Sequence, residues 1–265
     1  MRSLFEQIAP CFLAVLALSI ALIGDSRAAN TQDALADVTD LPLYEVIQDK
    51  ASTDMLGILI SGDGGWWTLD STVSKFLAEN GVPVIGVSSH KYFATPRTPD
   101  GTAADMARAL RWYLKKWDKK RIVLMGYSLG AEIIPFVATR LPEDLSKRVV
   151  MVVMIGPSAN TVFEFHLTDW VVTPSNREKF PVQPEIEKIH GPKLLCAYGD
   201  EDDTCICTKL DPKNVITIKR SGNHHFGGDF TGLAKVIWEA LAKAAQETAQ
   251  SSSESAAKPS TTSQH

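Results

Sequence analysis

The sequence has 265 residues, of which 45% are hydrophobic and 22% are charged, with a formal net charge of -4 at pH 7. A chain of this length and composition can bury one sizeable core, alone or with a small cap, which excludes a wholly disordered protein. The mixed, slightly acidic charge gives no general attraction to nucleic acid, and we expect no nucleic-acid partner.

Residues 1–28 are typical of a secretory signal peptide. Arg2 supplies a positive charge, which Glu6 weakens, and an apolar run extends from Ala9 to Ile23. Ser26 and Ala28 then provide the small residues of a cleavage site, so we expect export and cleavage after Ala28. The alternative is an uncleaved anchor, but a run of about 15 residues is short of the about 20 that span a bilayer.

Strands and helices alternate along the rest of the chain. Short apolar runs that end in glycine, serine or acidic residues predict six strands, at residues 55–65, 82–89, 121–128, 148–158, 192–202 and 214–222. Apolar residues spaced three and four apart predict an amphipathic helix at residues 102–118. Helix-like segments also predict helices at residues 71–80, 129–141 and about 231–245. This alternation, with strands of continuous apolar character, indicates an α/β protein with a mostly parallel sheet and helices on both faces.

Two segments depart from this rhythm. Residues 157–190 are rich in Pro, Phe and Trp, and we interpret them as a short cap or lid inserted in a domain of residues 29–245. Residues 246–265 are rich in Ser, Thr and Ala and nearly free of apolar side chains, so we predict a disordered tail there.

Three cysteines follow the predicted signal peptide, namely Cys196, Cys205 and Cys207. In an exported protein an odd number leaves one thiol over, or all three are reduced. The Cys205–Cys207 spacing has no matching His/Cys pair, so we expect no metal, and no cofactor is implied.

A candidate nucleophile lies in "LMGYSLGAE". Ser128 stands between a predicted strand and a predicted helix in a Gly-x-Ser-x-Gly frame, where larger residues at Gly126 and Gly130 would clash with neighbouring elements. Such a strained turn places the hydroxyl at a helix N-terminus, where backbone N–H groups favour negative charge. The alternative is an ordinary serine in a tight turn.

Candidate partners follow Ser128 in the chain order of an α/β-hydrolase, acid and then histidine. The strand end "AYGDEDDTC" supplies the acid, and its Gly-x-x-Asp frame selects Asp202, with Asp203 as the alternative. The segment "SGNHHFGGD" supplies the base, and its Gly-x-His frame selects His224, with His225 as the alternative. Both segments end strands, where α/β sheets place their sites. The sequence therefore predicts an α/β-hydrolase fold with a Ser-His-Asp triad.

The loop "SGDGGWW" is the candidate for the rest of the oxyanion hole. The residue after the nucleophile, Leu129, provides one backbone N–H, and Asp63 or Gly64 provides the second. We expect Trp66 to line the substrate site, although paired tryptophans such as Trp66 and Trp67 are as often part of a core.

These segments together resemble one known family. "ISGDGGWW", "KYF" with "RTP" nearby, "GYSLGAE", "YGDEDDTC" and "GNHHFGGD" are similar to the VirJ/AcvB family of bacterial virulence proteins, over roughly residues 56–241, in the shorter VirJ-like form with one such region. The resemblance implies an exported, periplasmic α/β-hydrolase-like protein. It also implies hydrolysis of aminoacyl-phosphatidylglycerol, with lysyl as the first expectation, and support of type IV secretion.

With that substrate, further residues become candidates for binding. Lys91 and Arg97 are available for the lipid phosphate, and Asp63, Glu132 and Glu164 for a cationic aminoacyl group, although each acid is more commonly a surface residue. The partners are then an aminoacyl-phospholipid at the membrane surface and type IV secretion components or cargo. Two other functions remain open: a binding or assembly accessory of that secretion system on a hydrolase scaffold, and a general carboxylesterase or thioesterase.

Overall fold

The computed structural model describes residues 37–48, 53–166, 169 and 177–257. The predicted signal peptide lies outside the described residues, so its cleavage stays a prediction. No helix within the described ranges combines the length and apolar character that crossing a membrane requires.

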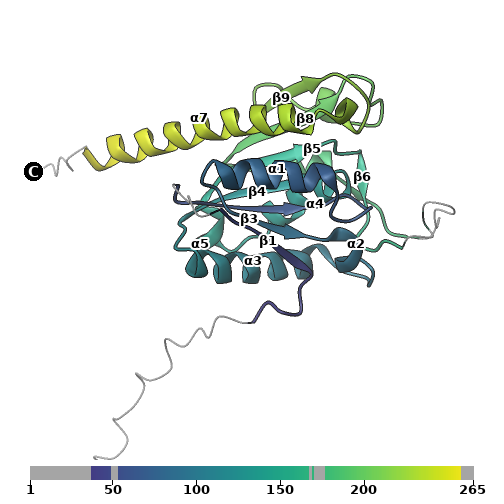
Figure 1. Ribbon diagram of the computed structural model, residues 1–265, viewed down its shortest axis with the longest axis horizontal. Helices are drawn as coiled ribbons and strands as arrows, with labels where there is room; N and C mark the ends of the chain where they lie inside the picture. Colours follow the sequence, from purple (N-terminus) through teal and green to yellow (C-terminus); the bar gives the residue numbers. More distant parts are fainter. Residues whose placement is uncertain (1–36, 49–52, 167–168, 170–176, 258–265) are drawn as a thin grey trace, which may run out of the picture. The chain divides into compact units, whose positions relative to one another are not determined.

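A seven-stranded sheet forms the centre of the fold, with strand order β1-β3-β2-β4-β5-β8-β9 (Figure 1). Its strands are β1 (Leu43–Val46), β2 (Met55–Ile60), β3 (Val84–Val87), β4 (Arg121–Tyr127), β5 (Val149–Ile155), β8 (Lys193–Gly199) and β9 (Val215–Arg220). Every neighbouring pair is parallel except β1 and β3. The six predicted strands are confirmed. The seventh, β1, was not predicted, because "LYEV" is short and only partly buried at the sheet edge.

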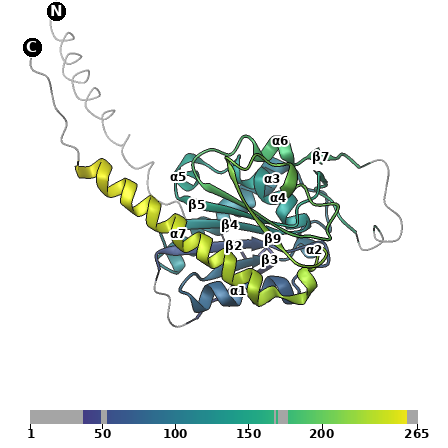
Figure 2. The same ribbon diagram turned by 90° about the horizontal axis from the view of Figure 1, so that it is seen from above.

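Helices cover both faces of the sheet, as Figures 1 and 2 show for α1, α3 and α7. On one face, α1 (Thr68–Glu79) contacts α7 (Phe230–Ala257), and α7 contacts β5. On the other, α3 (Pro99–Lys116) contacts α4 (Leu129–Ala138), which packs on β4 and β5. The buried apolar side chains accordingly form two clusters, one on each side of the sheet. Short helices complete the set: α2 (Ser89–Tyr92), α5 (Glu143–Ser146) and α6 (Gln183–Ile186).

The last helix is longer than predicted. We expected it to end at residue 245 and a disordered tail to begin at 246, but α7 continues to Ala257. The prediction of a disordered tail was therefore wrong for residues 246–257. A helix that is already nucleated by packing extends at small cost through residues such as Ala, Gln and Glu. Residues 258–265 lie outside the described part of the chain.

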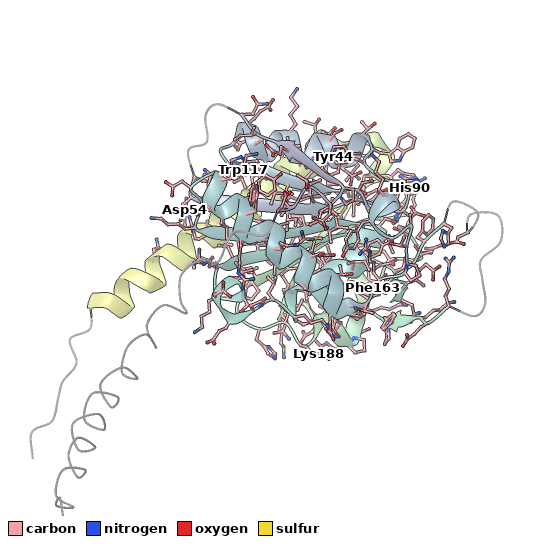
Figure 3. The ribbon with its side chains drawn as sticks, turned by 90° about the horizontal axis from the view of Figure 1, so that it is seen from below. Tyr44, Asp54, His90, Trp117, Phe163 and Lys188 are labelled. Atoms are coloured by element: carbon pink, nitrogen blue, oxygen red, sulfur yellow. A yellow bond between two sulfur atoms is a disulfide. The ribbon has the colours of Figure 1, made fainter. Side chains whose placement is uncertain are left out.

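The predicted cap at residues 157–190 is attached to the body by aromatic side chains. Its two short strands, β6 (Asn160–Thr161) and β7 (Phe180–Pro181), pair antiparallel. Phe163, labelled in Figure 3, packs edge-to-face against Phe180 and against Phe136 of α4. The described part of this segment is therefore tied to the face of the sheet that α4 covers.

Candidate active site

Ser128 occupies a strained turn between β4 and α4. Its backbone has φ 50° and ψ -120°, in a region that residues other than glycine rarely adopt. A Cβ atom at Gly126 would lie 2.1 Å from the carbonyl oxygen of Gly130, and one at Gly130 would lie 2.0 Å from that of Ile60. The predicted crowding at both glycines is confirmed. The turn presents Oγ of Ser128 at the N-terminus of α4.

The structure brings Ser128, His224 and Asp202 together in one hydrogen-bonded chain. Nε2 of His224 lies 3.0 Å from Oγ of Ser128, and Nδ1 lies 2.6 Å from Oδ2 of Asp202. An ionised carboxylate only accepts hydrogen bonds, so Nδ1 carries the ring proton and Nε2 is left to accept the serine hydroxyl. This is the arrangement in which an imidazole can take the proton of a serine nucleophile.

The acid is held by its own loop. Oδ1 of Asp202 accepts the hydroxyl of Thr204 at 2.7 Å and its backbone N–H at 3.2 Å. Burial alone would raise the pKa of Asp202, but the hydrogen bonds from Thr204 and His224 outweigh burial and hold that pKa below its usual value. Asp202 therefore stays ionised beside the imidazole. Asp203, the alternative acid, is exposed to solvent.

His225, the alternative base, contacts a different group. Its Nδ1 lies 2.9 Å from the hydroxyl of Tyr127, and its side chain is exposed. The ring of Tyr127 in turn stacks on His224, with centroids 5.4 Å apart. Tyr127 thus connects the two histidines and supports the orientation of His224.

The proposed oxyanion donors lie on either side of Ser128. As the first residue of α4, Leu129 has a backbone N–H without an acceptor inside the helix. Across the turn, a Cβ atom at Gly62 would lie 3.3 Å from Cβ of Ser128, so the 62–65 loop abuts the nucleophile. The backbone N–H of Gly64 donates to Oδ1 of Asp63 at 2.9 Å. Of the two predicted second donors, Gly64 therefore already has an acceptor within its own loop.

A cavity of about 420 Å³ opens beside Ser128 and His224. Trp67, Tyr127 and Phe230 provide much of its apolar lining. Trp67 is 64% exposed at this site. Trp66, which we expected to line the site, instead stacks on Tyr44 with centroids 5.3 Å apart. The expectation for Trp66 was wrong by one residue, because the ring that lines the cavity is that of Trp67.

The two predicted phosphate-binding residues lie elsewhere. Lys91 sits over the ring of Tyr44, 5.8 Å from its centroid. Arg97 covers the ring of Tyr92 at 4.4 Å and lines a different cavity, with Glu164 among its walls. Neither cation lines the cavity beside Ser128, so the structure does not join them to the candidate site.

The three acids suggested for a cationic aminoacyl group also lie in different places, and only one of them lines the cavity beside Ser128. Glu132 is buried rather than on the surface, its Oε1 accepts the backbone N–H of Ser158, and burial raises its pKa to about 7. Glu164 contacts His166 and Arg177 away from Ser128. Asp63 lines the cavity, and so does Asp70. Asp70 was not predicted from the sequence, because an acid in the first turn of a helix ordinarily serves as a cap.

A disulfide fixes the loop that carries the acid. Cys196 in β8 is bonded to Cys207, which leaves Cys205 as a buried free thiol. Residues 197–206, including Asp202, therefore lie within a closed loop. Across the part of the chain that the structure describes, no group of three or more His, Cys, Asp or Glu side chains is arranged to hold a metal ion.

The chain is similar to known proteins in sequence and in fold. A family model described as bacterial virulence protein (VirJ) matches residues 54–245. No curated protein matches the sequence. The family resemblance seen in the sequence motifs is thereby confirmed.

Among solved structures, Est1E from Butyrivibrio proteoclasticus superposes with a TM-score of 0.57 at 14% identity, covering 79% of this chain and 97% of that one. An esterase from Pyrococcus furiosus gives 0.53 at 15% identity, over 81% and 94% of the two chains. An alpha-beta serine hydrolase homologue from Coxiella burnetii gives 0.52 at 19% identity, over 75% and 90%. At these identities the likeness establishes the fold, and the predicted α/β-hydrolase fold is confirmed.

Proposed function

The chain belongs to the VirJ family of bacterial virulence proteins, and from that premise we propose that it is a periplasmic serine hydrolase that removes the aminoacyl group from aminoacyl-phosphatidylglycerol. The observation that carries this proposal is the unbroken hydrogen-bonded chain from Ser128 through His224 to Asp202. The proposed link to virulence and type IV secretion rests on the family.

The first half of the reaction acylates the enzyme. Nε2 of His224 takes the proton of Ser128 as Oγ attacks the aminoacyl carbonyl carbon. The negative charge on the carbonyl oxygen develops against the backbone N–H groups of Leu129 and Asp63, each worth about a hundredfold to a thousandfold in rate. The imidazolium, stabilised by Asp202, then gives its proton to the glycerol oxygen, which leaves with the lipid.

The second half releases the amino acid. Water enters, His224 removes its proton, and the resulting nucleophile attacks the acyl-serine. The intermediate collapses as His224 returns the proton to Oγ of Ser128, and the free amino acid departs. The cavity beside Ser128 is large enough for one aminoacyl group, since ligand sites commonly measure about 300–1,000 Å³.

The exposed Trp67 supports a substrate delivered from a lipid surface. Tryptophan is enriched at membrane–water interfaces, where its ring sits at the level of the headgroups. A Trp67 side chain that is 64% exposed at the catalytic cavity is suited to contact a bilayer while an ester headgroup enters.

The proposal is tested with purified mature protein and vesicles of lysyl-phosphatidylglycerol, by following free lysine. Wild type is expected to release lysine, and Ser128→Ala to release it at the rate of the buffer blank. Cleavage of short p-nitrophenyl esters without any lysine release would identify a general carboxylesterase instead. Equal lysine release by wild type and Ser128→Ala would show that Ser128 is not the nucleophile.

A separate measurement addresses the accessory role in secretion. If hydrolysis is the function, Ser128→Ala expressed in place of wild type leaves the secretion or virulence phenotype unrescued. Full rescue by Ser128→Ala would favour an assembly protein on a hydrolase scaffold.

A further inference from the structure

Asp70 is a buried carboxylate in the wall of the catalytic cavity. It is the third residue of α1, lines the cavity beside Ser128 and His224, and has no exposed surface. Its Oδ2 accepts the backbone N–H of Trp67 at 3.0 Å, which accounts for one oxygen as a helix cap. Its Oδ1 is buried and has no hydrogen-bond partner. Helix capping therefore accounts for only one of the two carboxylate oxygens of Asp70.

An unpartnered buried oxygen of this kind destabilises the fold. Leaving a buried acceptor without a donor costs free energy, and the cost is larger when the group is charged. Burial raises the pKa of Asp70 to about 7, so near neutral pH the carboxylate is poised between its two forms. A cation that binds nearby in the cavity stabilises the ionised form.

Asp63 provides a second carboxylate on the same cavity. It is partly exposed and belongs to the loop that abuts Ser128. Among the described residues that line this cavity there is neither lysine nor arginine. Trp67 and Tyr127 add aromatic rings, whose faces also attract ammonium groups.

We propose that Asp63 and Asp70 form an ammonium-binding subsite that selects acyl groups bearing a free amine for attack by Ser128. The subsite rests on the proposed function, because it concerns the acyl group of the ester that Ser128 cleaves. Asp63 is the carboxylate that the ammonium group reaches first, and Asp70 adds a second negative charge from a position that solvent does not screen. Anionic acyl groups are repelled by the same pair.

The test uses four p-nitrophenyl esters that share a six-carbon acyl chain: lysyl, norleucyl, 6-aminohexanoyl and hexanoyl. They carry both amines, the α-amine alone, the terminal amine alone, and none. We expect wild type to show a kcat/KM about ten- to a hundredfold higher for at least one amine-bearing ester than for the hexanoyl ester, the size of a charge-assisted hydrogen bond. The pattern across the esters identifies which amine the subsite holds.

The variants Asp63→Asn and Asp70→Asn keep the shape of each side chain and remove its charge. In Asp70→Asn the amide oxygen can still accept the Trp67 N–H. Each variant is expected to reduce the ratio of amine-bearing to hexanoyl kcat/KM about tenfold or more. Asp144→Asn is the matched control, because Asp144 lies in α5 and pairs with Arg111, and its ratio should equal that of wild type. Circular dichroism establishes that each variant is folded.

Equal rates for all four esters in wild type, or unchanged ratios in both cavity variants, would overturn the subsite. If wild type cleaves amine-bearing esters selectively but releases no lysine from lipid vesicles, the lipid substrate fails and the subsite stands. If wild type cleaves none of the esters, the comparison moves to ligand-observed NMR of lysinamide and hexanamide with Ser128→Ala. Preferential binding of lysinamide that Asp70→Asn abolishes supports the subsite, and equal binding of both amides refutes it.

Discussion

Oδ2 of Asp202 lies 2.6 Å from Nδ1 of His224, and the Asp202 side chain is only 4% exposed. This contact fixes the tautomer of the imidazole, since a carboxylate can only accept the proton on Nδ1. It also holds Nε2 toward Ser128. Asp202, and not its exposed neighbour Asp203, makes the hydrogen bond that supports the base.

Replacing Asp202 by Asn is expected to reduce kcat by about a hundredfold to ten-thousandfold with little change in KM, because an amide no longer selects the productive tautomer. Steady-state kinetics on the 6-aminohexanoyl ester measure this. Asp203→Asn is the matched control and should retain most of the activity. Greater damage from Asp203→Asn than from Asp202→Asn would reverse the assignment.

The Cys196–Cys207 disulfide closes the loop that contains Asp202 and Thr204. Cys196→Ser combined with Cys207→Ser is expected to lower the free energy of unfolding by about 2–4 kcal/mol and to lower kcat, because the acid loses its anchor. Denaturant unfolding and ester hydrolysis measure the two effects. Cys205→Ala, which removes the neighbouring free thiol, should cost about 1 kcal/mol or less. Full activity in the double variant would show that the loop holds Asp202 without the bond.

The buried Asp70 should make stability depend on pH in a defined direction. The pKa of its carboxyl group is 3.8 when the group is exposed, as in the unfolded chain, and about 7 in the folded protein. Below the lower value both states hold the proton and the cost is absent. As pH rises from there toward 7, the unfolded chain releases the proton while the folded protein retains it, so stability falls.

Asp70→Asn removes that dependence. The variant is therefore expected to melt at a higher temperature than wild type at pH 8, by on the order of 5 °C for a domain of this size, and the difference should shrink as the pH is lowered toward 4. Thermal unfolding at pH 4, 6 and 8 measures it. A variant that melts below wild type at pH 8 would show that the Asp70 carboxylate is stabilised by partners in the fold.

Trp67 should matter more for lipid than for soluble substrate. Trp67→Ala is expected to raise KM for lysyl-phosphatidylglycerol vesicles several-fold, with a smaller effect on soluble esters, because the indole contacts the headgroup region. Ile216→Ser is the matched control, since Ile216 is an exposed apolar residue on β9 outside the cavity. If KM rises equally in both variants, or rises in neither, Trp67 has no specific role in lipid binding.

Much of the fold follows from local sequence. The buried central strands consist of continuous apolar residues, such as "VVMVVMI" in β5, and this pattern identifies strands covered on both faces. Strand β1 escaped prediction because its four residues carry no such pattern and its position depends on pairing with β3. The end of α7 was misplaced because composition alone does not reveal how far a packed helix extends.

The site was predictable where chain geometry is rigid. Glycine spacing selected Ser128, Asp202 and His224, because each frame reflects close backbone packing at a strand end. The surrounding residues were harder. Lys91 and Arg97 were nominated by charge, yet each packs on a nearby tyrosine ring. Asp70 lies far from Ser128 in sequence, and only the tertiary packing of α1 brings it to the cavity.

In the proposed reaction Ser128 is a nucleophile activated by His224. The most direct test is intact-protein and peptide mass spectrometry after incubation with a fluorophosphonate, which reacts covalently with activated serines. We predict one adduct, on Ser128, that is absent in Ser128→Ala and forms about a hundredfold more slowly in His224→Ala. No adduct, or an adduct on another residue while Ser128 stays unmodified, would contradict it.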